Sequence, residues 1–88
     1  MASKKQTELI NLWTKKGYLV INLIKTNKNG IPDLQALRNK KVVFIESKEH
    51  GDTVKQLQIF RMRELTKNGF QCYVNEQKFE KWLEDNPQ

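Results

Sequence analysis

Gly30-Ile31-Pro32-Asp33 and Phe44-Ile45-Glu46-Ser47-Lys48 are the two segments that decide how this 88-residue chain folds. Each places charged residues at one end of a run that is otherwise typical of a buried strand. The proline fixes its own φ and pushes the residue before it towards extended geometry, while the glycine permits an unusual turn. The aspartate is therefore delivered to the start of a strand in a set direction.

Residues 33–37 and 42–48 are predicted to pair as an antiparallel hairpin across the polar turn between them. Alternate side chains on a strand share a face, so Glu46 and Lys48 point the same way. Neither face of the second strand is polar before Glu46, which is typical of a central strand covered on both sides. In this hairpin Asp33 would lie opposite the 46–48 end, where paired Cβ atoms are about 5 Å apart.

The rest of the chain is predicted to supply three helices and two more strands. Helical spacing of apolar residues, helix-end signals and runs of aromatic and β-branched residues define them. We expect helices over 3–15, 53–67 and 78–84, with Thr53 capping the second and Asn68-Gly69 ending it, and strands over 18–24 and 70–74. The order α-β-β-β-α-β-α predicts an α/β fold, and the length predicts a single domain over residues 1–88.

The composition narrows the class of protein. A formal net charge of +6 and a pI of about 9.6 favour an anionic partner such as nucleic acid. No apolar run approaches the roughly 20 residues of a membrane span, and the polar start of the chain offers no signal-peptide core. Cys72 is the single cysteine, which excludes an intrachain disulfide and a zinc site built on a cysteine cluster. We therefore expect a cytoplasmic protein with no membrane partner.

Asp33 and Glu46 are the candidate catalytic pair. Two carboxylates this close repel each other unless a cation or a proton lies between them. Carboxylates together with carbonyls and waters suit Mg²⁺ or Mn²⁺ better than Zn²⁺, which favours histidine and cysteine. Lys48 would aim a positive charge at a phosphate in the transition state. The alternative interpretations are an exposed glutamate–lysine pair that ends a strand and a Pro-Asp unit that only begins a turn.

Gln58 and Glu8 are candidates on the two longer helices. The buried stripe of the second helix is predicted from Val54, Leu57, Met62 and Leu65, and Gln58 lies inside it. A buried amide needs partners, so Gln58 either bonds to a sheet edge or loop, or points into the same opening as Glu46. Glu8 lies on the flank of the first helix, where it is either an ordinary solvated residue or completes a metal shell.

The basic residues are spread along the chain. They would contact DNA if the fold aligns them along one groove, and they are ordinary solvated charges otherwise. The candidates are Lys15, Lys16, Lys28, Lys40 and Lys41. His50, in a glycine-containing loop, is assigned no role.

Taken together, Gly30-x-Pro32-Asp33-Leu34, Phe44-Ile45-Glu46-x-Lys48 and Gln58 resemble the PD-(D/E)xK nucleases, and most closely the small stand-alone VRR-NUC domains found in phages. The likeness runs from Glu8 to Val74. It implies a restriction-endonuclease-like fold, in which a mixed sheet is flanked by helices. It also implies a metal-dependent endonuclease that hydrolyses DNA in the cytoplasm of a phage's bacterial host.

The resemblance implies a role for each matching residue. The residues with implied catalytic roles are Asp33, Glu46, Lys48 and Gln58. Magnesium or manganese would be held by Asp33, Glu46, the backbone carbonyl of Ser47 and, as a further ligand, Glu8. Lys48 would orient the attacking water or stabilise the scissile phosphate. Ser47 departs from the family pattern, which more often has a β-branched apolar residue there, but it keeps the carbonyl.

Three functions are consistent with the sequence. The first is a structure-specific endonuclease that acts as a homodimer on branched DNA of the Holliday-junction kind, with Trp82, Phe79 and Tyr18 as candidate interface residues. The second is a nuclease-fold module that binds DNA without cutting it. The third is a small scaffold that binds a protein partner through Trp13 or Trp82. The preferred DNA structure, the polarity of cutting and the number of metal ions stay open.

Overall fold

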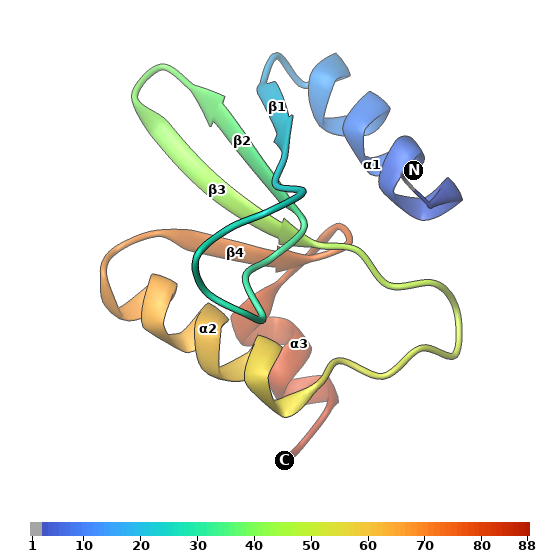
Figure 1. Cartoon of the computed structure of the whole chain (residues 1–88), viewed down its shortest axis with the longest axis vertical. Helices are drawn as coiled ribbons and strands as arrows, with labels where there is room; N and C mark the ends of the chain where they lie inside the picture. The colour runs from blue at the N-terminus through green and yellow to red at the C-terminus, as the bar shows by residue number, and fades with distance from the viewer. Residues whose placement is uncertain (1–2) are drawn as a thin grey trace.

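The computed structural model describes residues 3–88 and has a five-stranded sheet in the order β1-β2-β3-β4-β5. Helix α1 covers one face of the sheet, and α2 and α3 cover the other (Figure 1). The elements are α1 (Lys4–Lys15), β1 (Leu19–Asn22), β2 (Leu34–Arg38), β3 (Lys41–Glu46), α2 (Gln56–Lys67), β4 (Gln71–Val74), β5 (Gln77–Lys78) and α3 (Phe79–Asp85). The mixed sheet flanked by helices that the sequence predicted is confirmed.

The hairpin formed by β2 and β3 sets the register of the site. The two strands pair antiparallel, and Leu34 lies opposite Ile45. Asp33 immediately precedes this pair on one strand, and Glu46 immediately follows it on the other. The predicted hairpin is confirmed, and it brings both acidic residues to the same end of the sheet. On its other side β3 runs parallel to β4, with Glu46 opposite Val74.

Two apolar clusters hold the sheet between its helices. The cluster beneath α1 contains Leu9, Trp13, Leu34, Ala36, Val43 and Ile45. The cluster beneath α2 and α3 contains Val54, Ile59, Met62, Cys72, Val74 and Phe79. Strand β3 contributes to both, because Val43 and Ile45 face α1 while Phe44 packs on the opposite side. The expectation of a central strand covered on both faces is therefore correct.

The start of α2 differs from the prediction. The helix begins at Gln56 and its N-cap is Lys55, so the expectation of a cap at Thr53 was wrong. Leu57 was also wrongly placed in the buried stripe, because its side chain is 43% exposed and the buried helix residues are Ile59 and Met62. The strand β5 was missed, since Gln and Lys carry no strand signal.

The C-terminal helix also corrects an expectation. Phe79 was proposed as an interface residue, but it is almost fully buried and its ring stacks on Trp82, with 6.2 Å between the ring centroids. Trp82 and Tyr18 are only partly buried.

Within residues 3–88, the helices are too short or too polar to cross a membrane.

Gly30 lies in the long loop that leads to β2, where the chain packs closely against Leu57 of α2. Its φ is +82°, and a Cβ atom there would lie 2.7 Å from Cγ of Leu57 on α2. We expect Gly30→Ala to lower the free energy of unfolding by about 1–3 kcal/mol, because it combines backbone strain with overpacking. Gly69→Ala is the matched control, since Gly69 has a φ of +92° and no atom within 4 Å of the added Cβ. Equal losses for the two variants in urea titrations would show that the contact with Leu57 adds nothing.

Candidate active site

The predicted acidic, lysine and glutamine side chains meet where β3 ends. Glu46 is the last residue of β3, and it is only 1% exposed. Its Oε2 accepts a hydrogen bond from Nε2 of Gln58 at 2.9 Å and lies 3.6 Å from Nζ of Lys48. Among the residues that the structure describes, Oε1 of Glu46 is one of the few buried side-chain atoms without a hydrogen-bond partner. The carboxylate thus has one oxygen fixed by the protein and one left open.

Gln58 links this carboxylate to the start of α2. While its Nε2 donates to Glu46, its Oε1 accepts a hydrogen bond from the backbone N–H of Lys55 at 2.8 Å. The second bond satisfies one of the free N–H groups at the helix start. Both sequence interpretations of Gln58 are therefore realised at once, because the amide bonds to a loop and also points at Glu46.

Asp33 is held against the chain that continues from β3. Its Oδ2 accepts hydrogen bonds from the backbone N–H of Ser47 at 3.1 Å and from the Ser47 hydroxyl at 2.6 Å. The sequence assigned only a carbonyl to Ser47, so the role of the hydroxyl was missed. The available signal was a small polar side chain directly after Glu46, but the resemblance to the family pointed only to the backbone carbonyl at this position.

The electrostatics of Glu46 are those of a site that needs a cation or a proton. Burial, and after it the charge of Asp33, raises the pKa of the Glu46 carboxyl group to about 7, although the charge of Lys48 acts in the opposite direction. The open Oε1 is the atom on which either partner would be placed. This donor set of hard oxygens fits a magnesium or manganese ion.

Comparison with known proteins shows the family and the fold of the chain. The family model described as the VRR-NUC domain matches residues 2–78. The chain belongs to the VRR-NUC family. One of the solved structures that match, titled "VRR_NUC domain", is 22% identical in sequence, with a TM-score of 0.70 over 99% of this chain and 100% of that one. At this identity the likeness shows the fold. No curated protein matches the chain at a comparable level.

Glu8 does not join the group of side chains at the end of β3, which is formed by Asp33, Glu46, Lys48 and Gln58. Residues 3–88 contain no group of three or more acidic, histidine or cysteine side chains placed to hold a metal ion. Glu8 is exposed and forms an ion pair with Lys5 at 3.7 Å. The reason is the orientation of α1, whose buried residues Leu9 and Trp13 face the sheet and leave Glu8 on the flank. The expectation of a three-acid metal shell is therefore not met.

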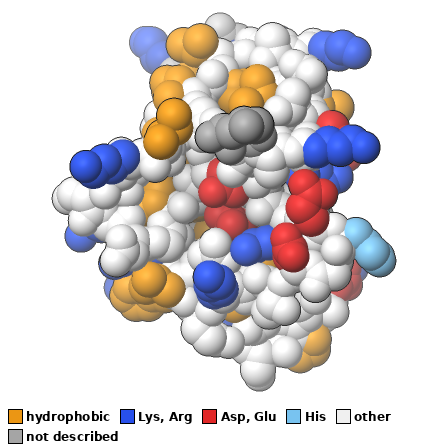
Figure 2. Space-filling model, turned by 45° about the vertical axis from the view of Figure 1, so that its right-hand side comes forward, with side chains coloured by type: hydrophobic (Ala, Val, Ile, Leu, Met, Phe, Trp, Pro, Cys, Tyr) orange, Lys and Arg blue, Asp and Glu red, His pale blue; other side chains and the backbone are white. Residues whose placement is uncertain are grey.

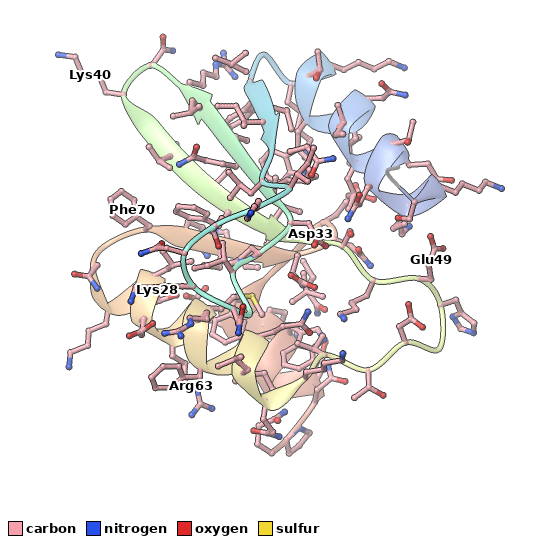
Figure 3. The ribbon with its side chains drawn as sticks, viewed as in Figure 1. Lys28, Asp33, Lys40, Glu49, Arg63 and Phe70 are labelled. Atoms are coloured by element: carbon pink, nitrogen blue, oxygen red, sulfur yellow. The ribbon has the colours of Figure 1, made fainter. Side chains whose placement is uncertain are left out.

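Most of the predicted DNA-contacting lysines lie far from the acidic pair. Lys15 and Lys16 are at the last turn of α1, and Lys40 and Lys41 are at the turn of the β2–β3 hairpin. Five strand steps separate Lys41 from Glu46, or about 17 Å at the usual rise. Figure 3 shows Lys40 at the tip of the hairpin, well away from Asp33.

Lysines nearer Asp33 and Glu46 line two cavities. Lys28 shares a cavity of about 420 Å³ with Lys25 and Asp33. Lys48 lines a second cavity of about 630 Å³ together with Lys5. On the face seen in Figure 2, acidic side chains gather near the middle, with Lys and Arg side chains beside them. Lys5 was not among the basic residues considered, because nothing in the sequence separates it from the other lysines.

The raised pKa of Glu46 predicts a pH-dependent stability. Its carboxyl group ionises near pH 4.5 in the unfolded chain and near pH 7 in the folded one, so stability is lost as the pH rises through this window. At pH 8 the loss is at most about 3.5 kcal/mol, from roughly 1.4 kcal/mol per pKa unit. We expect Glu46→Gln to unfold at higher urea concentration than the wild type at pH 8, without divalent metal. The advantage should shrink towards pH 5.

The control for this measurement is Glu76→Gln, a change at an exposed glutamate in the β4–β5 turn. It should shift stability equally at pH 5 and pH 8. A Glu46→Gln variant whose advantage does not grow with pH would show that the buried carboxylate is not the source of the effect.

Proposed function

We propose that this protein is a metal-dependent endonuclease that hydrolyses phosphodiester bonds in DNA. Membership of a nuclease-domain family supports the proposal. The observation that carries it is the buried Glu46 with one unpartnered oxygen, placed next to Asp33 and Lys48. Such an arrangement is costly for a fold and has a clear use when a cation is shared between two carboxylates.

Magnesium or manganese would be held by Asp33, Glu46 and the carbonyl of Ser47. The backbone N–H of Ser47 points at Asp33. Since N–H and C=O of one residue in extended chain lie on the same edge, the carbonyl of Ser47 is on the Asp33 side as well. When bound, the metal would polarise the scissile phosphate and lower the pKa of a water molecule.

The side chains around the carboxylates have distinct tasks in this proposal. Lys48, whose side chain is 16% exposed, keeps its ammonium group at the edge of the site, where it stabilises negative charge that develops on the phosphate. Gln58 fixes the rotamer of Glu46 through its hydrogen bond to Oε2. The hydroxyl and N–H of Ser47 fix Asp33 in the same way. The acidic pair is thus held in place before substrate binds.

Branched DNA is the proposed substrate, and a homodimer is the proposed active form. Resolving a four-way junction requires two symmetric cuts, and a two-fold axis presents the same site to both strands. Exposed apolar residues on the edge strand β1, Leu19 and Ile21, offer surface for such a contact. Recognition would rest on phosphates and junction shape, because the sequence contains no base-reading motif.

Cleavage of a labelled four-way junction and of a matched linear duplex, each with Mg²⁺, with Mn²⁺ and with a chelator, tests this function. We expect metal-dependent cuts at symmetric positions on the junction, and binding that weakens steeply with salt. Light scattering in dilute solution should report a dimer. A monomer that cuts duplex as readily as junction would leave a generic nuclease. Tight binding with no cutting under any metal would favour the non-cutting DNA-binding module.

A further inference from the structure

The side chain of Asn75 makes two hydrogen bonds to the main chain of a single residue, Lys48. The backbone N–H of Lys48 donates to Oδ1 of Asn75 at 2.9 Å, and Nδ2 of Asn75 donates to the carbonyl of Lys48 at 3.1 Å. The backbone N–H of Asn75 donates to the carbonyl of Glu46 at 2.8 Å. Asn75 is thus hydrogen-bonded to the main chain of Glu46, the last residue of β3, and of Lys48, two residues further along the chain.

These hydrogen bonds of Asn75 lie at the point where the pairing of β3 with β4 ends. Strand β3 ends at Glu46, and the chain enters the long loop that precedes α2 (Figure 1). Strand β4 ends at Val74, which pairs with Gln77 of β5 across a two-residue turn that begins at Asn75. Beyond Glu46, β3 therefore has no main-chain neighbour on the β4 side. The carboxamide of Asn75, which carries the same C=O and N–H groups as a peptide, takes that place.

The hydrogen bonds alternate along the chain as they would in a continuing strand. The carbonyl of Glu46 bonds towards Asn75, the N–H of Ser47 bonds towards Asp33, and both backbone groups of Lys48 bond towards Asn75 again. This alternation is the pattern of a strand with a neighbour on each side. Ser47 and Lys48 are thereby held in extended geometry between two side chains from different strands.

The backbone conformation of Asn75 allows its side chain to make these hydrogen bonds. Its φ is +57°, in the left-handed region that asparagine tolerates better than most residues. This conformation lets the side chain point back along the sheet while the main chain turns into β5.

We propose that Asn75 is a positioning residue that fixes the main chain of Lys48, and with it the reach of the Lys48 ammonium group to the scissile phosphate. The inference rests on the proposed nuclease function. Lysine has a long flexible stem, so the position of its charge depends on where its Cα is held. Misplacing a catalytic group by about 1 Å can cost roughly 100-fold in rate.

Asn75→Gly is the informative variant, because glycine keeps the left-handed turn and the N–H bond to Glu46 but removes the carboxamide. We expect the single-turnover cleavage rate at saturating DNA to fall by about 10–100-fold, the range typical of positioning partners in active sites. DNA affinity should stay close to wild type, and thermal stability should fall only by the modest amount expected for two lost hydrogen bonds. In hydrogen exchange followed by NMR, the Lys48 amide should lose its protection.

Asn39→Gly is the matched control. Asn39 also has a positive φ of 48°, in the β2–β3 turn at the opposite end of β3 from Glu46. This variant should cleave DNA at the wild-type rate and should keep the Lys48 amide protected.

An Asn75→Gly protein with a protected Lys48 amide, or with a normal cleavage rate and an unprotected amide, would overturn the inference. If the wild type cuts no DNA, the proposed function fails and the role in cleavage fails with it. In that case the exchange measurement alone still decides whether Asn75 holds the Lys48 main chain.

Discussion

Replacing either Asp33 or Glu46 by alanine is expected to abolish DNA cleavage while leaving DNA binding largely intact. The two carboxylates are the proposed ligands of the catalytic metal, and metal ions contribute several kcal/mol of transition-state stabilisation, so a loss of roughly 10³-fold or more is expected. DNA binding is proposed to depend on lysines and arginines that these changes do not touch. Cleavage of a labelled junction and fluorescence anisotropy with the same DNA measure the two properties separately.

The conservative variants sharpen this test. Asp33→Asn can still accept the hydrogen bonds from Ser47, and Glu46→Gln can still accept the one from Gln58, so both keep the local structure while removing a charge. We expect both to be as inactive as the alanine variants and to bind Mn²⁺ weakly in calorimetric titrations without DNA. Near-normal cleavage by both variants would refute the assignment of Asp33 and Glu46 as the metal ligands.

The hairpin could be predicted because its information is local. Pro32 and Gly30 restrict the chain before Asp33, and the alternation of residues along β3 sets which side Glu46 faces. A one-residue slip would have turned Glu46 to the opposite face of the strand. Register and site therefore follow from the same pattern, and Leu34 opposite Ile45 confirms it.

The start of α2 could not be predicted, because it is decided by a tertiary contact. Thr53 is a better N-cap than Lys55 by propensity. In the fold, however, Gln58 must reach Glu46, and its other amide atom then bonds to the N–H of Lys55 and fixes the helix start there. Local propensity is overridden by a side chain that serves both the helix and the site.

Ser47 and Asn75 show a second limit of sequence reasoning. Each has a partner far along the chain, 14 positions away for the Ser47–Asp33 bonds and 27 for the Asn75–Lys48 bonds. A lone serine or asparagine in a sequence carries no sign of such a partner, since both are common in turns and loops. The predicted hairpin already places Lys41 at the opposite end of β3 from Glu46, whereas only the folded chain shows the cavity that Lys28 shares with Asp33.

Removing the ammonium group of Lys48 should lower the cleavage rate by about two to four orders of magnitude in Lys48→Ala, the range expected for the loss of one transition-state stabiliser. Affinity for DNA should fall little, since one phosphate contact among several is lost. Lys67→Ala, which removes an exposed charge at the end of α2, is the control and should cut normally.

The pH dependence of this loss separates two contributions. The positive charge of Lys48 holds down the pKa of Glu46, so its removal raises that pKa above the wild-type value of about 7. At pH 7 the variant is then deficient twice, because it lacks the ammonium group and because more of Glu46 is protonated and unable to bind metal. At higher pH the carboxylate is more fully ionised in both proteins, so the deficit that remains at pH 9 comes mainly from the missing ammonium group. We therefore expect the ratio of wild-type to variant rates to shrink from pH 7 to pH 9 but to stay well above one. A ratio of one at pH 9 would mean that Lys48 acts only through the ionisation of Glu46, and a ratio of one at every pH would favour a fold that binds DNA without cutting it.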